Sequence, residues 1–215
     1  MRDTSIQGMG TVRNGPSNRL RDVHQLISRQ AVSEIASWPE RPRHAPVRQE
    51  QLMKVVRSHG VEHPITVVSR SDYLTEHPRH TNVVPRRVQY VAIADFHWLE
   101  AARALEMPFV SVVVQPMPRD SVHAYVLRRH CHDDYLGPLD EARLLRAALH
   151  APGQTRSQNM FAEELGYSRA TVSQRLSLLE LTPGEQAALE AGELGLGHAR
   201  RIVTDRRRSR DPKMT

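Results

Sequence analysis

The sequence of 215 residues has little cysteine, few aromatic residues and no long apolar run. The single cysteine, Cys131, excludes an intramolecular disulfide framework and a cysteine-rich zinc module, and it favours a reducing compartment. Aromatic residues make up 5% of the chain, so the core must be mostly aliphatic, and broad base-stacking surfaces are not expected. The longest apolar stretches, Tyr90 to Ala94 and Val110 to Val114, are far shorter than the roughly 20 residues of a membrane helix. We therefore expect no membrane span.

Lysine is nearly absent, because only Lys54 and Lys213 occur among the 30 basic residues. The arginine bias reflects either GC-rich coding or selection for the planar guanidinium that grips phosphate. The formal net charge is +6 and the pI about 10.1, which favours a polyanionic partner, nucleic acid first, through counterion release. Residues 1–29 contain no continuous apolar segment behind their arginines, so we expect no signal peptide and a cytoplasmic location.

The first half of the chain alternates between strand and helix patterns. Residues 1–30 have few periodic apolar positions and the composition of a flexible arm. From Gln49 to Ser58 the apolar residues share one helical face, and Gly60 is placed as a left-handed cap. β-branched runs predict strands at Pro64 to Ser69, Val88 to Ala94 and Phe109 to Val114, and Leu99 to Leu105 predicts a helix between the last two. The alternation indicates a small α/β domain over residues 31–117.

The second half of the chain has helical patterns only, so we place a domain boundary near residue 117. Leu139 to Leu149 has apolar residues at helical spacing and is entered through Gly137-Pro138. Thr182 begins a Thr-Pro-Gly-Glu sequence with the form of a capping box, which predicts another helix. The expected fold class is α+β: the α/β domain, an all-helical domain over residues 118–205, and a solvated basic tail over residues 206–215.

Residues 158–179 predict a helix-turn-helix. Apolar residues line one face of a first helix, Gly166 and Tyr167 form a tight turn, and Ser168 is placed to cap a second helix whose apolar stripe includes Val172. The alternative is an ordinary helical hairpin with a polar outer face. The second helix contains no acidic residue, which argues against that alternative.

The polar face of the second helix supplies candidate DNA contacts. Ala170, Thr171 and Gln174 lie opposite the apolar stripe. We expect Gln174 to make a bidentate contact to adenine and Thr171 to contact a thymine methyl group. Arg169 and Arg175 are expected to hold phosphates. The full set of candidate DNA-binding residues is Gln158, Ser168, Arg169, Ala170, Thr171, Ser173, Gln174, Arg175, Arg200, Arg206, Arg207 and Arg208.

Four further segments, in fixed order around this motif, carry a family resemblance. They are LMKVVRSHGVEHPITVV (52–68), YVAIADFHWLEAARAL (90–105), GPLDEARLL (137–145) and EAGELGLGHARRI (190–202). Together they resemble the ParB family of bacterial chromosome- and plasmid-partition proteins and related regulators. The resemblance implies a ParB/sulfiredoxin-like N-terminal domain, a helical domain that binds palindromic double-stranded DNA, often as a dimer, and a partition ATPase as partner. Family chains continue into a C-terminal dimerisation domain, whereas this sequence stops at Thr215, so the oligomeric state stays open.

The resemblance also implies a nucleotide pocket, from which this chain departs. ParB proteins bind and hydrolyse CTP with a Gly-Glu-Arg-Arg box after a strand and an Asn- and Arg-containing box before a later helix. The first box falls here on Asp95, Phe96, His97 and Trp98, and the second on Arg129, His130, Cys131, His132 and Asp133. A triphosphate needs close backbone approach and guanidinium charge, and both boxes have lost that chemistry. We therefore expect a degenerate pocket and no cofactor.

The histidines of the two boxes also raise the question of a metal site. Chance clustering among 12 histidines explains such a run, and no metal is expected. No Gly-x-Ser-x-Gly, Walker or His-Glu-x-x-His motif occurs. The sequence therefore predicts a sequence-specific DNA-binding protein, a transcriptional regulator or partition factor, and not an enzyme. A CTPase, ATPase or nuclease on the ParB/sulfiredoxin-type domain, and a pure interaction adaptor, stay open as alternatives.

Overall fold

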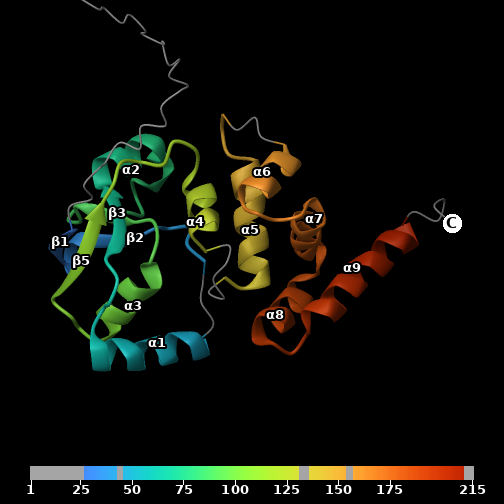
Figure 1. The fold of residues 1–215 in the computed structure, drawn as a ribbon, viewed down its shortest axis with the longest axis horizontal. Coiled ribbons are helices and arrows are strands. Elements are labelled where there is room, and N and C mark those ends of the chain that lie inside the picture. Colours follow the sequence, from blue (N-terminus) through green and yellow to red (C-terminus); the bar gives the residue numbers. More distant parts are fainter. Residues whose placement is uncertain (1–26, 43–45, 131–135, 154–156, 211–215) are drawn as a thin grey trace, which may run out of the picture.

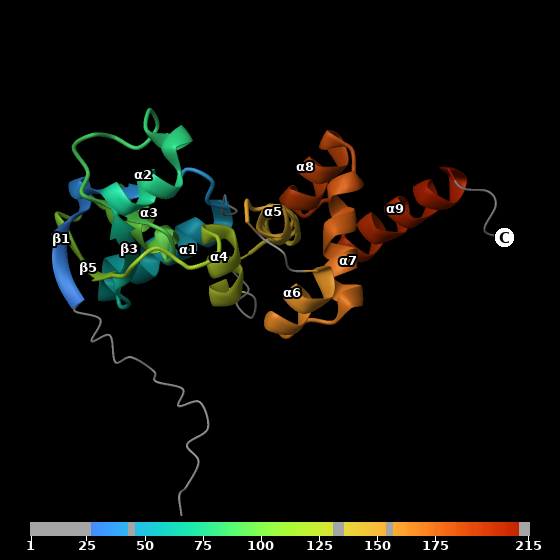
Figure 2. The same ribbon diagram turned by 90° about the horizontal axis from the view of Figure 1, so that it is seen from above.

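A computed structural model describes residues 27–42, 46–130, 136–153 and 157–210 (Figure 1). A five-stranded sheet with its helices forms the first half of the molecule, and a group of helices forms the second. In both views α4 (Val122–His130) and α5 (Pro138–Leu149) lie between the sheet and the later helices, and the last of these, α9 (Leu196–Arg210), projects away from the body (Figure 2). No helix in the described ranges is long and apolar enough to cross a membrane.

The sheet has the strand order β1-β5-β3-β4-β2. β3 is central, pairing in parallel with β5 and antiparallel with β4, and four of its five residues are buried. β1 and β2 are the edges, pairing with β5 and β4 respectively. The three strands predicted from the sequence are confirmed as β3, β4 and β5. The bounds are β1 Ile27–Ala31, β2 Ile35–Ser37, β3 Ile65–Ser69, β4 Tyr90–Ala92 and β5 Phe109–Val114.

The predicted helices of the first half are also present. α1 (Pro46–His59) ends at Gly60, whose φ of 79° is left-handed and whose N–H donates to the Val56 carbonyl over 2.8 Å. α2 (Arg70–Glu76) follows β3 directly. α3 (Phe96–Ala104) begins three residues before the predicted Leu99, because Asp95 takes a left-handed turn at the end of the strand segment. Short 3-10 turns, η1 (Val32–Glu34) and η2 (Pro78–His80), complete this half.

The second half contains helices that begin where their capping signals predict. α5 begins at Pro138 with Gly137 as N-cap. At α8 the Thr182 hydroxyl accepts from the Glu185 N–H over 3.3 Å, and the Glu185 carboxylate accepts from the Thr182 N–H over 2.8 Å, which confirms the capping box. The bounds are α4 Val122–His130, α5 Pro138–Leu149, α6 Gln158–Glu164, α7 Arg169–Ser177, η3 Leu178–Glu180, α8 Pro183–Ala191 and α9 Leu196–Arg210.

The structure corrects the expected extents of the flexible arm and the basic tail, in the residues that it describes. Residues 27–30, assigned to the arm, belong to β1, which pairs residue by residue with β5 from Ile27↔Val113 to Ala31↔Phe109. Residues 206–210, assigned to the basic tail, continue α9. Contacts far along the chain stabilise both segments, so their local composition was a poor guide. Residues 1–26 and 211–215 lie outside the described ranges.

One hydrophobic cluster runs through the position where the sequence predicts a domain boundary. It includes Trp38 and Tyr73 from the first half, Leu127 of α4, Leu145 of α5 and Val172 of α7, all fully buried. Residue 117 therefore marks the end of the strands, while the core continues across it through α4. Smaller clusters lie under α1 and α3 and between α8 and α9.

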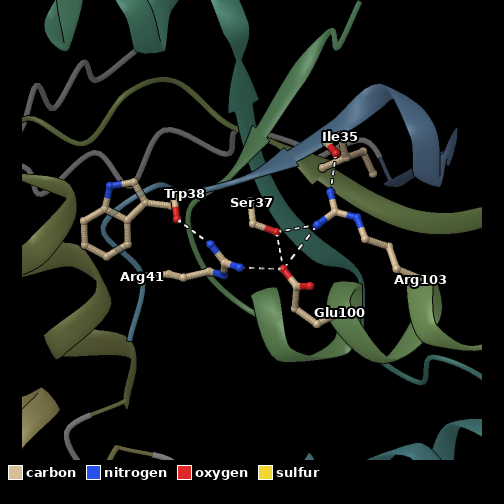
Figure 3. Close-up of polar contacts among 6 residues, drawn as sticks. All are labelled: Ile35, Ser37, Trp38, Arg41, Glu100 and Arg103. Atoms are coloured by element: carbon tan, nitrogen blue, oxygen red, sulfur yellow. Dashed lines mark hydrogen bonds and ion pairs between the residues drawn. The ribbon is translucent and has the colours of Figure 1, made fainter. Parts of the chain in front are cut away.

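A polar network covers the outer edge of β2 (Figure 3). Arg103 of α3 donates to the Ile35 carbonyl over 2.5 Å and to the Ser37 hydroxyl over 2.7 Å. The Glu100 carboxylate accepts from Ser37 over 2.6 Å and lies 3.2 Å from Arg103 and 3.3 Å from Arg41. Burial lowers the pKa of Arg103, and the neighbouring Glu100 opposes that shift. The edge carbonyl of this strand is thus occupied by a side chain and is not open to another strand.

A second polar cluster joins the start of α4 to the first half. The Glu40 carboxylate lies 3.0 Å from His80 Nε2, 2.8 Å from His123 Nε2 and 2.5 Å from Arg79. Burial lowers the pKa of His123 below its ordinary 6.5, although Glu40 raises it. Burial and the charge of His80 lower the pKa of His77 in the same way. Burial raises the pKa of Glu40, but the charges of His123, Arg79 and His80 outweigh that effect and lower it.

The edge network predicts the effect of removing Arg103. Arg103→Met leaves the Ile35 carbonyl and the Ser37 hydroxyl without this donor, so we expect the free energy of unfolding to fall by about 1–3 kcal/mol. The measurement is urea unfolding followed by circular dichroism. Arg57→Met, at an exposed position of α1, is the matched control and should change stability by less than about 0.5 kcal/mol. Equal effects at the two positions would show that the network adds nothing.

The Glu40 cluster predicts a loss of stability in acid. The folded state disfavours protonated His77 and His123, so their contribution is complete above pH 6.5 and declines as the pH falls below it. Urea unfolding at pH 7.5 and pH 5.5 should give a lower free energy of unfolding at pH 5.5. His123→Asn should flatten this dependence, and His198→Asn, at an exposed position of α9, should leave it unchanged. A dependence that His123→Asn does not alter would contradict the assignment.

Candidate nucleic-acid interface

The helix-turn-helix predicted from the sequence is present as α6 and α7. Phe161 of the first helix and Leu165, its C-cap, are both 2% exposed, and Gly166, with a φ of 69°, reverses the chain. The Ser168 hydroxyl accepts from the Thr171 N–H over 3.0 Å and caps α7. Val172 is fully buried and packs α7 onto the common core. The turn and the cap together fix the direction in which α7 leaves α6.

The outer face of α7 is small, polar and exposed. Arg169, Ala170, Ser173 and Gln174 are all exposed there, as the helical periodicity predicts. Thr171 is half-buried, and its hydroxyl lies 2.9 Å from the Ser168 hydroxyl, so both groups belong to the cap. Gln158, the first residue of α6, is half-buried. This face can enter a major groove without bringing a carboxylate near phosphate.

The structure corrects the prediction for Arg175. Its side chain is 21% exposed, and its Nε lies 2.6 Å from a carboxylate oxygen of Glu141 on α5, a side chain that is 7% exposed. Arg175 therefore faces α5, where the buried carboxylate supplies its counter-charge. The guanidinium is already paired within the protein, so the predicted role as a phosphate contact is wrong in this structure.

The basic residues of α9 divide into paired and unpaired groups. Arg206 lies 2.8 Å from Glu185, and this hydrogen bond, with the capping contacts of Thr182, holds the pKa of Glu185 at about 2. Arg207 is paired with Glu180. Arg201 and Arg208 are exposed and make no ion pair within the described residues. Arg201, which the sequence interpretation did not single out, thus joins Arg200 and Arg208 as a candidate phosphate contact, whereas Arg206 and Arg207 stabilise the helices.

The two boxes of the expected nucleotide pocket do meet in space. Asp95, His97 and Trp98 from the first box and Arg129 and His130 from the second line one open cavity of about 770 Å³. The sequence interpretation missed His63, Pro64 and Tyr125, which complete the lining together with Arg128. His63 and Pro64 precede β3 and Tyr125 lies on α4, so only the fold brings them to the cavity. His132 and Asp133 lie outside the described residues.

Both guanidinium groups at this cavity, those of Arg128 and Arg129, form ion pairs with carboxylates. Asp95 is 6% exposed, accepts from the Thr66 hydroxyl over 2.9 Å and lies 3.3 Å from Arg129. Arg128 lies 2.5 Å from Asp120 and 3.0 Å from Glu164 of α6. An incoming phosphate would have to compete with these carboxylates.

The remaining box residues belong to the protein interior. Phe96 is 1% exposed and packs in the cluster that spans both halves, and Trp98 is 8% exposed and packs in the cluster under α1 and α3. His97 and His130 are also buried, with ring centroids 6.2 Å apart. Within the described residues no group of three His, Cys, Asp or Glu side chains has the arrangement of a metal site. Cys131 lies outside those residues.

Comparison with known proteins matches both halves of this architecture. Residues 134–213 match the family described as ParB HTH domain. A probable chromosome-partitioning protein ParB from Coxiella burnetii is 28% identical over 154 residues, 72% of this chain and 47% of that protein. A nucleoid occlusion protein from Listeria monocytogenes is 26% identical over 155 residues, 72% of this chain and 48% of that protein. The chain thus spans about half the length of these relatives.

Solved structures show the same fold. The C-terminally truncated chromosome-partitioning protein ParB from Caulobacter crescentus, complexed to the centromeric parS site, aligns with a TM-score of 0.52 and 22% identity over 82% of this chain and 84% of that one. A Pnob8-like ParB-N domain aligns with a TM-score of 0.51 and 13% identity over 88% and 86% of the two chains. The second half of the chain thus contains a ParB HTH domain, and the chain as a whole is similar to ParB proteins in sequence and in fold.

Proposed function

We propose that this chain binds specific sites in double-stranded DNA and acts as a partition factor or transcriptional regulator. The observation that carries the proposal is the exposed face of α7, where Arg169, Ala170, Ser173 and Gln174 are free of carboxylates. Among them, Gln174 has the donor and acceptor pair that matches adenine in the major groove. The solved ParB from Caulobacter crescentus is complexed to its parS site, which supports the same class of partner here.

Phosphate contacts would set the position of this helix on the duplex. Arg169 lies at the first turn of α7, and Arg200, Arg201 and Arg208 lie on α9. Such contacts give affinity for any sequence and leave discrimination to the base-reading face. A site with inverted-repeat symmetry, read by two copies of the chain, and a partition ATPase as partner are parts of the same proposal.

We further propose that CTP does not control DNA binding by this chain. The support is the pairing of Asp95 with Arg129, because a buried carboxylate stands at the cavity where a triphosphate would need positive charge. Asp95 has a φ of 56°, a conformation that glycine adopts without strain. The backbone of the first box thus keeps a turn suited to glycine, while the side chain removes the anion site.

The first expected outcome concerns Gln174. Gln174→Ala should weaken binding to the preferred duplex by about 1–3 kcal/mol and have little effect on random DNA, because it removes a base contact and no charge. The duplex is obtained by sequencing DNA that the unaltered chain enriches from a random pool, and affinities are measured by fluorescence anisotropy. Gln89→Ala, at an exposed glutamine of the sheet-bearing half, is the control. Equal losses on both DNAs would remove the base-reading role.

The second expected outcome concerns nucleotide. Isothermal titration with CTP and with ATP, each with and without magnesium, should show no micromolar binding by the unaltered chain. Asp95→Gly suits the left-handed backbone and releases Arg129, so it should raise triphosphate affinity. Glu106→Gly, at an exposed residue with a φ of 52°, is the matched control. Micromolar binding by the unaltered chain, or nucleotide-dependent release from DNA, would overturn the proposal.

A further inference from the structure

We propose that the buried ion pair between Glu141 and Arg175 sets the rotation of α7 about its axis and thereby determines which bases the chain prefers. The inference rests on the proposed function, because it assigns a positioning role within the same DNA-reading surface. Neither residue touches DNA in this proposal. The pair acts through Gln174, the neighbour of Arg175.

The pair lies in the interface between α5 and α7. Glu141 stands in the first turn of α5, and Arg175 in the last turn of α7. Glu141 Oε1 and Arg175 Nε and Nη1 are buried without a hydrogen-bond partner among the described residues, and Arg175 Nε lies 2.6 Å from Glu141 Oε2, a contact between charges and not an aligned hydrogen bond. A charged pair buried at a helix contact is costly to desolvate. Apolar side chains at the same positions would therefore stabilise the contact between α5 and α7 as well or better. A charged pair adds to such a contact a preferred rotation of one helix relative to the other.

Helix geometry links the direction of Arg175 to that of Gln174. Adjacent residues of an α-helix point about 100° apart, so a guanidinium held toward α5 leaves Gln174 on the exposed face. Val172, three residues earlier, is buried on the same side as Arg175 but makes only apolar contacts, which tolerate a small roll of the helix. A roll of α7 that moved the guanidinium away from Glu141 would leave two buried charges without their counter-charge, so the ion pair tolerates less rotation. Base contacts require placement within about 0.5 Å and 10–20°, so a small roll is enough to spoil them.

This positioning role has a signature that separates it from a phosphate contact. An arginine on phosphate adds affinity to every sequence and contributes about 0.9 to the slope of log affinity against log salt. An arginine paired with Glu141 adds neither. Its loss should therefore lower the affinity for the preferred duplex and leave both the affinity for a scrambled duplex and the salt slope unchanged.

The test removes both charges at once. In the double variant Glu141→Met, Arg175→Met no charge is left buried without its partner, so the chain is expected to fold with a melting temperature at or above that of the unaltered protein. The probes are the duplex enriched by the unaltered chain and a scrambled duplex of equal composition. We expect the ratio of the two affinities to fall by about tenfold, at an unchanged salt slope.

Two further variants keep the test decisive. Glu141→Gln retains every positive charge and nearly the same shape, and it should lower the affinity ratio in the same direction even if the double variant is unstable. Arg143→Met removes an arginine of α5 that pairs with Glu190 of α8 over 2.7 Å, and it should leave the ratio unchanged.

The outcomes separate this proposal from the function on which it rests. An unchanged ratio in the double variant or in Glu141→Gln would show that the pair only stabilises the fold, and would overturn the positioning role alone. Equal losses of affinity for both duplexes, together with a flatter salt slope, would show that Arg175 contacts phosphate. That result would also overturn the positioning role alone. An unaltered chain that enriches no duplex would overturn the proposed function as well.

Discussion

Two adjacent arginines of α4 connect the halves of the molecule. Arg129 lies against Asp95 at the start of α3, and Arg128 lies against Asp120 and Glu164, the latter on α6 of the helix-turn-helix. The same helix contributes Leu127 to the hydrophobic cluster that runs from the sheet to α7. The position of the helix-turn-helix relative to the sheet thus depends on contacts of one short helix. Ion pairs and the burial of apolar side chains together hold that helix in place.

Pairing of arginine with carboxylates is the recurring way in which this chain joins its elements. Arg128 with Glu164, Arg175 with Glu141 and Arg206 with Glu185 each connect two helices that are separate in the sequence. The planar guanidinium suits this use because it can donate to several acceptors at once. A net charge of +6 therefore overstates the charge available to DNA. Arg169 of α7 and Arg201 and Arg208 of α9 are among the exposed arginines that make no ion pair within the described residues.

Local signals in the sequence predicted most of the elements. The caps at Ser168 and Thr182 and the glycine after α1 work through atoms within a few residues, so their positions could be inferred without the fold. Pairings across the chain could not. β1 exists because β5 lies beside it, and Arg175 turns inward because Glu141 is buried on α5. Helical periodicity placed Arg175 on the flank of α7, where either solvent or a neighbour could have received it, and only tertiary packing decides between them.

Asp95 affects the cavity in two ways, through its backbone and through its side chain. The residue holds a left-handed turn between strand and helix at the cavity that the two boxes line. Its carboxylate, however, is held by Thr66 and faces Arg129, so the charge that the cavity would present to an anion is spent inside the protein. Because Arg129 is also the link from α4 to the sheet, this internal pair holds α4 in place whatever the cavity contains.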